Sequence, residues 1–133
     1  MGHSDLNYLI QHMHPELLPE PVVFISLSPE SSEPHIAHAR AVIRETEGVT
    51  LVITQDYADT TGLTYDGVYR QISLAVESDL EAVGLTAAFA AALAEQNIPA
   101  NVLAGYYHDH ILVPDQLAEQ AQQCLLEVAR SAE

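Results

Sequence analysis

The stretch Val76-Glu77-Ser78-Asp79-Leu80-Glu81-Ala82-Val83-Gly84-Leu85-Thr86-Ala87-Ala88-Phe89 decides the fold. Before it, residues 70–77 alternate between apolar and polar side chains, which predicts a strand with one buried face. After it, apolar residues repeat at helical spacing from Leu85 to Leu93, which predicts a helix over residues 81–96. A short acidic loop therefore joins a strand to a helix at this point of the chain.

This loop has two interpretations. Ser78 and Glu81 stand at the spacing of a capping box, and Asp79 adds a negative charge near the positive end of the helix dipole. In the first interpretation, these residues only start the helix and have no further role. Gly84, however, costs about 1 kcal/mol relative to alanine inside a helix. It is easier to explain if a backbone or a small polar ligand approaches closely there.

The remaining elements follow from periodicity and from the placement of proline and glycine. Pro15, Pro19 and Pro21 predict an extended connection after the first helix. The expected elements are a helix over residues 5–12, a strand over 22–27, a helix from Pro34 to Glu47, a strand over 49–54, a polar loop over 56–67, a hairpin of residues 101–106 and 108–113, and a last helix after Pro114.

This order of elements predicts an α+β fold of ferredoxin-like type. Two β-α-β units, each with an antiparallel sheet and helices on one face, account for the sequence of strands and helices. We expect residues 1–66 to form a reduced first unit that includes the N-terminal helix, and residues 67–133 to form the second unit. The two units are expected to pack as one compact body.

Composition excludes several classes of partner. The chain has 133 residues with 19 acidic and 4 basic side chains, for a formal net charge of −15. Nucleic acids and anionic membrane surfaces need clustered lysine and arginine, so neither is an expected partner. The single cysteine, Cys124, allows no internal disulfide, and no apolar run is long enough to span a bilayer. We expect a cytoplasmic protein.

Motifs for catalysis are scarce. No nucleophile elbow, phosphate-binding glycine loop or zinc-protease motif occurs, so we expect neither an enzyme nor a cofactor. His108 and His110 are two residues apart and would share one face of a strand, an arrangement that can hold a metal. A metal-binding protein or a metal-dependent enzyme is therefore an alternative, although solvated histidines at a hairpin end are the simpler interpretation.

The segment from Glu77 to Asn101 resembles the strand-loop-helix-strand segment of ACT domains, including those of aspartate kinases. The similarity extends to small bacterial ACT-domain proteins and to the ACT units of cytosolic arginine sensors. Two motifs carry it: Val83-Gly84-Leu85-Thr86-Ala87 at the helix start, and Tyr106-Tyr107-His108-Asp109-His110-Ile111-Leu112-Val113-Pro114 in the following hairpin. The resemblance is good over residues 69–130 and fainter over residues 21–60.

The resemblance implies a non-catalytic regulatory protein that binds a small effector, an amino acid in the first instance, and that forms a homodimer. Carried onto this sequence, it places the ligand between the helix start and the hairpin. An alternative is a protein-interaction module whose effector site is vestigial. The implied ligand-binding residues are Ser78, Asp79, Leu80, Glu81, Ala82, Val83, Gly84, Leu85, Tyr106 and Asp109.

Overall fold

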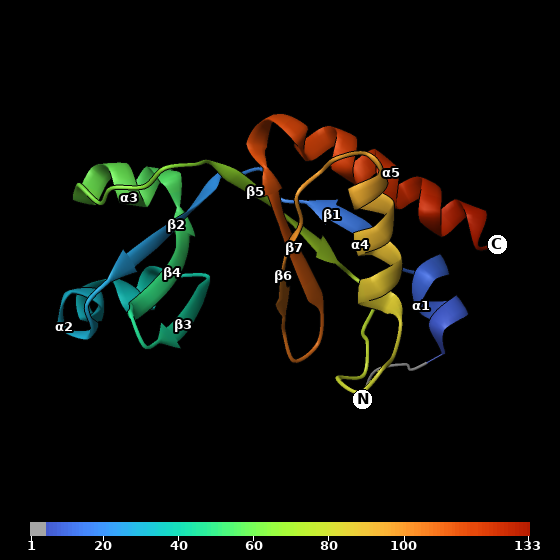
Figure 1. Cartoon of the computed structure of the whole chain (residues 1–133), viewed down its shortest axis with the longest axis horizontal. Helices are drawn as coiled ribbons and strands as arrows, with labels where there is room; N and C mark the ends of the chain where they lie inside the picture. Colours follow the sequence, from blue (N-terminus) through green and yellow to red (C-terminus); the bar gives the residue numbers. More distant parts are fainter. Residues whose placement is uncertain (1–4) are drawn as a thin grey trace. The chain divides into compact units, whose positions relative to one another are not determined.

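The computed structural model describes residues 5–133, and its internal contacts divide the chain into two units (Figure 1). Residues Glu20–Tyr69 form one unit, called the inserted unit below. The segment that ends at Pro19 and the segment Arg70–Glu133 together form the other, called the flanking unit. One division falls between Tyr69 and Arg70, and the N-terminal helix packs with the C-terminal segment.

The flanking unit is built around a sheet whose strands come from two separate segments of the chain, in the order β1-β5-β7-β6. β1 pairs antiparallel with β5, and β6 pairs antiparallel with β7. The edge strand β1 comes from the N-terminal segment, so the last position of the sheet is filled by residues that precede the inserted unit. The elements are α1 (Leu6–Gln11), β1 (Pro15–Leu17), β5 (Tyr69–Leu74), α4 (Leu85–Glu95), β6 (Asn101–Ala104), β7 (Asp109–Pro114), η2 (Asp115–Leu117) and α5 (Ala118–Ser131).

Helices α4 and α5 lie together beside this sheet, and α1 packs against both of them (Figure 1). The core between helices and sheet contains Phe89 of α4, Leu125 of α5 and Ile72 of β5, all fully buried. Leu9 and Met13 from the N-terminal segment are also fully buried in the same cluster. Burial of such side chains stabilises the unit by about 1.5–3 kcal/mol each.

The inserted unit has its own sheet and its own core. Strand β4 lies between β2 and β3 and pairs antiparallel with both. Its apolar cluster includes Val23, Ile25, Leu51, Ile53 and Ala58. The elements are β2 (Val22–Leu27), α2 (Pro29–Ser32), η1 (Glu33–His38), β3 (Ala41–Glu45), β4 (Gly48–Thr54) and α3 (Gln55–Thr61).

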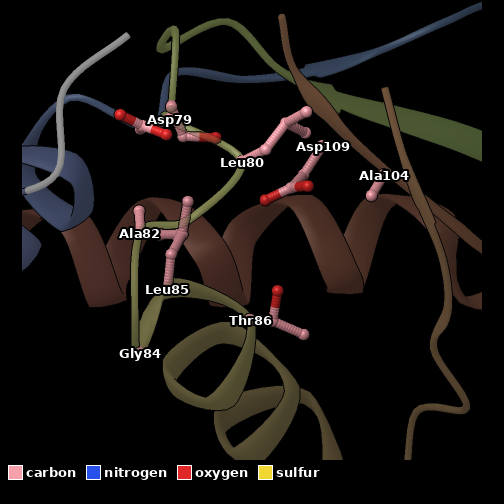
Figure 2. A pocket seen from close by; sticks show the side chains of 9 residues that line it. Asp79, Leu80, Ala82, Gly84, Leu85, Thr86, Ala104 and Asp109 are labelled. Atoms are coloured by element: carbon pink, nitrogen blue, oxygen red, sulfur yellow. The ribbon is translucent and has the colours of Figure 1, made fainter. Parts of the chain in front are cut away.

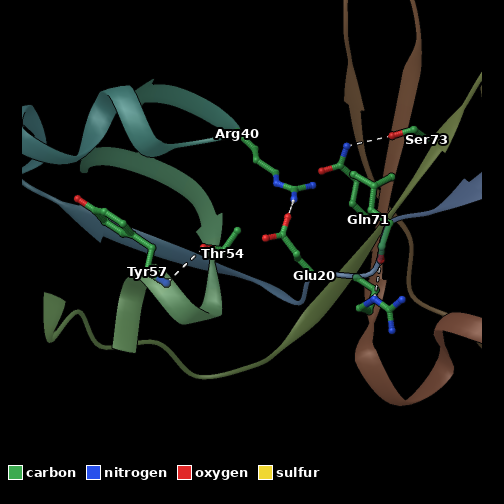
Figure 3. Close-up of polar contacts among 8 residues, drawn as sticks. Glu20, Arg40, Thr54, Tyr57, Gln71 and Ser73 are labelled. Carbon is green, nitrogen blue, oxygen red and sulfur yellow. Dashed lines mark hydrogen bonds and ion pairs between the residues drawn. The ribbon is translucent and has the colours of Figure 1, made fainter. Parts of the chain in front are cut away.

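Short polar contacts fix segment ends within each unit (Figure 3). In the inserted unit, Arg40 Nη2 lies 2.7 Å from Glu20 Oε1, and the Thr54 side chain caps α3 by accepting from the Tyr57 amide. In the flanking unit, Arg70 Nε donates to the Leu18 carbonyl at 2.8 Å. The guanidinium of Arg70 thereby attaches the end of the N-terminal segment to β5.

Two expected elements are wrong. Residues 34–47 do not form a helix; they form the short 3₁₀ helix η1 and then strand β3, which pairs with β4 through the register Ala41↔Val52. The β-branched Val42 and Ile43 favour a strand once a partner strand is available. Residues 56–67 are not a loop throughout, because α3 occupies Gln55–Thr61, with Thr54 as its N-cap and Gly62 as a left-handed C-cap.

The predicted fold class is confirmed. Both units combine an antiparallel sheet with helices, and the flanking unit has the strand arrangement of a ferredoxin-like fold. The strand over residues 22–27, the strand over residues 49–54 and the last helix are all present. The hairpin is present too, with a first strand that ends earlier than expected and a second strand shifted by one residue. The region that joins β5 to α4 is the one that positions the candidate site.

Candidate functional site

A cavity of about 170 Å³ lies in the flanking unit, between the loop after β5, the start of α4 and the β6–β7 hairpin (Figure 2). Thr86 and Ala104 on its wall are exposed, so solvent and small molecules can reach it. Most of the wall comes from the loop that decides the fold. The lining residues are Ser78, Asp79, Leu80, Ala82, Gly84, Leu85, Thr86, Ala104 and Asp109.

The capping box expected at Ser78 and Glu81 does not form, because helix α4 begins only at Leu85. Instead, Asp79 Oδ1 accepts a hydrogen bond of 3.0 Å from the backbone amide of Glu81 and stabilises the turn before the helix. Gly84 is the N-cap, and no side chain among the described residues caps α4. The amides in the first turn of this 11-residue helix therefore lack the side-chain acceptor that Thr54 gives to α3.

Backbone conformation and packing both explain why position 84 is a glycine. Its φ of +102° lies in a region that residues with a Cβ rarely adopt. A Cβ at this position would also lie 3.0 Å from Cδ2 of Leu6 in α1. The glycine expected inside the helix thus stands at its N-cap, and the close neighbour is a leucine side chain of the same unit.

Asp109 forms the opposite side of the cavity. It is the first residue of β7 and pairs in register with Ala104, the last residue of β6. Figure 2 shows its side chain directed toward the start of α4, where the Thr86 hydroxyl points back toward it. Burial raises the pKa of the Asp109 carboxyl above its ordinary value, and the nearby His110 partly opposes this rise.

We expect Asp109→Asn to stabilise the ligand-free protein at pH 7. A carboxyl whose pKa is raised in the folded state stabilises that state fully below its unfolded pKa, here 3.8, and this contribution is lost as pH rises through the folded pKa. Urea denaturation at a series of pH values should show the advantage of the variant at pH 7 and its decline as the pH falls toward 4. An advantage that is constant with pH would contradict this account.

The two histidines of the hairpin do not form the expected pair on one strand face. His108 precedes β7, and its Nδ1 lies 3.2 Å from the Val76 carbonyl oxygen. His110 Nδ1 lies 2.8 Å from Ser73 Oγ, and burial lowers the pKa of this imidazole. Within residues 5–133, no group of three or more His, Cys, Asp or Glu side chains is arranged to hold a metal.

Seven of the ten expected ligand-binding residues line the cavity, and three do not. Glu81 is exposed and donates its backbone amide to Asp79, and Val83 and Tyr106 are 82% and 68% exposed. The sequence reasoning missed Thr86 and Ala104. Thr86 was detectable in principle, since it occupies the first turn of α4, but a small residue such as Ala104 gives no sequence signal.

Comparisons with known proteins identify the family. Two family models described as ACT domains match residues 1–70 and residues 67–127, so that together they cover nearly the whole chain. The chain belongs to the ACT-domain family. It is a tandem-ACT protein, as the resemblance in the helix start and the hairpin implied.

Several solved structures are similar to this tandem-ACT protein. A Vibrio cholerae protein of unknown function, described as a possible transport protein, is 46% identical over 93% of this chain and 95% of its own, with a TM-score of 0.82. An Agrobacterium tumefaciens protein is 18% identical over 86% and 87% of the two chains, with a TM-score of 0.69. No curated protein matches the chain.

The regulatory subunit of aspartate kinase from Thermus flavus has the same fold. It is 9% identical over 86% of this chain and 96% of its own, with a TM-score of 0.65. ACT domains in aspartokinases are regulatory rather than catalytic parts of those enzymes.

Within the described residues of the present chain, no helix is long and apolar enough to cross a membrane.

Proposed function

We propose that this tandem-ACT protein is a non-catalytic regulatory protein that binds an amino acid in the cavity of the flanking unit. The observation that carries the proposal is the pairing of an uncapped helix start with an aspartate on opposite sides of one small cavity. Such an arrangement is complementary to a molecule that carries a carboxylate and an ammonium group a few atoms apart. Membership of a family with regulatory members supports the same function.

The carboxylate of the amino acid would bind at the start of α4. Backbone amides at a helix N-terminus and the helix dipole together favour an anion. The hydroxyl of Thr86, in the first turn of α4, is a further donor on the same wall. Gly84, the N-cap of the helix, lies on the same wall.

The ammonium group would bind on the opposite wall, at Asp109. Hydrogen bonds between an ammonium and a carboxylate are charge-assisted and stronger than neutral ones. A volume of about 170 Å³ is below the roughly 300–1,000 Å³ of pockets for drug-sized ligands, which favours a ligand as small as a free amino acid.

A thermal-shift panel of the twenty amino acids tests the proposal. The true effector should stabilise the protein by RT ln(1 + [L]/Kd), about 2.7 kcal/mol at one hundred times Kd. Asp109→Asn and Thr86→Val should each reduce this shift. Asp66→Asn, the same loss of charge at an exposed position that does not line the cavity, serves as the matched control and should keep it.

A panel in which no amino acid raises Tm would exclude the proposed function. A second candidate function would then gain support. Leu80 and Val83 of the loop and Tyr106 and Tyr107 of the hairpin are large apolar side chains that are 58–82% exposed. Exposed apolar side chains of this kind favour a protein-interaction surface, which includes the homodimer expected from the family.

A further inference from the structure

A chain of side-chain hydrogen bonds joins β5 to β7 in the flanking unit. Gln71 Nε2 donates to Ser73 Oγ at 3.0 Å (Figure 3), and Ser73 Oγ lies 2.8 Å from His110 Nδ1. Gln71 Nε2 also lies 3.3 Å from the same imidazole nitrogen. Ile72 and Ile111 of the same two strands are buried in the core with the helices. Because side chains alternate along a strand, the three polar residues lie on the opposite face of the sheet.

These bonds specify the protonation state of His110. The amide nitrogen of Gln71 can only donate, and Ser73 accepts its hydrogen bond and directs its own hydroxyl hydrogen to the imidazole. His110 Nδ1 is therefore an acceptor, and the neutral ring carries its hydrogen on Nε2. A Cβ at Gly105 would lie 3.2 Å from this Nε2, so the missing side chain at position 105 leaves the space that the ring occupies.

Protonation of His110 is incompatible with this arrangement. A hydrogen on Nδ1 makes this atom a donor, and it then faces a second donor, the Gln71 amide nitrogen, at 3.3 Å. Ser73 would also have to turn its hydroxyl hydrogen away from the ring. Acid therefore breaks a contact that the neutral imidazole keeps.

The titratable groups around His110 come from its own hairpin and from β1. Burial lowers the pKa of His110, the nearby His108 adds to this effect, and Asp109 opposes it. The register partner of His110 on β6 is Leu103, and Glu16 of β1 pairs in register with the serine of β5. Strands β5 and β6 contain no carboxylate that could pair with an imidazolium.

We propose that His110 is a pH-sensitive contact between β5 and β7: protonation of its imidazole breaks the hydrogen-bond chain from Gln71 through Ser73 and loosens the β6–β7 hairpin from β5. The hairpin carries Asp109 on the wall of the cavity, so acid also disturbs that wall. The contact responds to protons without any ligand, and it is independent of the function proposed above.

The sign of the effect follows from the lowered pKa. A histidine whose pKa is lowered on folding does not affect stability above its unfolded pKa, here 6.5. It reduces the free energy of unfolding as the pH falls below that value, because the unfolded chain then binds a proton more readily than the folded one. The hairpin should therefore be tightest at neutral pH and above.

NMR and hydrogen exchange on the ligand-free protein test the proposal. The His110 imidazole should titrate with a midpoint below 6.5, and its nitrogen chemical shifts at pH 7.5 should report a hydrogen on Nε2. Backbone amides of β5 and β7 should exchange about threefold or more faster at pH 5.5 than at pH 7.5, after correction for the intrinsic effect of pH on exchange.

Variants assign the response to His110. His110→Asn keeps an acceptor oxygen close to the position of Nδ1 but takes up no proton, so exchange at the same amides should become nearly independent of pH. His14→Asn is the matched control, because His14 is exposed and its positive φ suits asparagine. This variant should keep the response of the parent protein. Ser73→Ala removes the donor to Nδ1, so the titration midpoint of His110 should move up.

Three results would overturn the proposal. The first is a His110 midpoint at or above 6.5. The second is an equal pH response in the parent and in His110→Asn, because another group would then cause the loosening. The third is an unchanged midpoint in Ser73→Ala, a measurement that decides the question even where His110→Asn fails to fold by circular dichroism.

Discussion

Phe89→Ala should lower the free energy of unfolding by about 3–5 kcal/mol, the range measured for large aromatic residues cut back in a packed core. Phe89 is fully buried at the centre of α4, in one cluster with Leu9, Ile72 and Leu125. The change removes contacts with helices and sheet at once and leaves a cavity that the surrounding side chains fill only partly. A typical domain is stable by about 5–15 kcal/mol, so the loss is a large part of the total.

Urea denaturation measures this loss, with Val83→Ala as the matched control. Val83 is 82% exposed in the loop before α4, and its truncation should change the free energy of unfolding by no more than about 0.5 kcal/mol. Phe89→Leu should cost clearly less than Phe89→Ala, because most of the volume is kept. A loss below about 1 kcal/mol for Phe89→Ala would contradict the core described for the flanking unit.

Gly84→Ala is the second change with a large expected effect, at about 1–3 kcal/mol of stability. The backbone at Gly84 has a φ of +102°, and the new methyl group would lie 3.0 Å from Cδ2 of Leu6. The same substitution should also weaken ligand binding, because Gly84 lines the cavity at the helix start. Thermal denaturation and calorimetry on the same variant measure the two effects.

Gly62 provides the control for Gly84→Ala. It has a φ of +75°, closer to the left-handed minimum, and a Cβ there would meet nothing within 4 Å. Gly62→Ala should therefore cost less than Gly84→Ala and should leave binding intact. The double variant Leu6→Ala/Gly84→Ala isolates the contact, since the backbone strain persists when the leucine is shortened. Equal losses of stability in Gly84→Ala and Gly62→Ala would contradict the extra cost that we assign to backbone strain and crowding at Gly84.

The sequence was most informative where the local signal and the tertiary structure agree. The apolar run of residues 22–27 and the alternation in residues 49–54 both correspond to observed strands. The first helix is also observed, and the Asp5 side chain caps it by accepting from the Asn7 amide. In each case, the hydrogen bonding and burial of the residues that carry the pattern are provided within the element itself or by one neighbouring face.

The errors arose where tertiary pairing or local caps outweighed periodicity. Ile36, Ala39 and Ile43 repeat at helical spacing, yet pairing with β4 makes residues 41–45 a strand. The aspartates and threonines of residues 55–61 are common in loops, yet caps at both ends of α3 make them a helix. Three-residue β1, which begins with a proline, lies at a sheet edge where its missing amide is tolerated.

In the candidate site, too, some residues were predictable from the sequence and others were not. The loop and the start of α4 were singled out by a glycine and two acidic residues, which are visible in the sequence. The participation of Asp109 followed from the family resemblance, because 24 positions separate it from Leu85 in the chain. Ala104 entered the site through the register Ala104↔Asp109, which no pattern in the sequence encodes.

The origin of β1 has a consequence for synthesis on the ribosome. The chain emerges from its N-terminus, so Leu9, Met13 and β1 appear before the strands and helices that bury them. The inserted unit, Glu20–Tyr69, can complete its own core before the partners of these residues have been synthesised. Its folding brings Glu20 and Tyr69 near one another through the pair Val22↔Tyr69, which shortens the effective loop between β1 and β5. An inserted unit that folds first thereby shortens the loop that must close to complete the unit that carries the site.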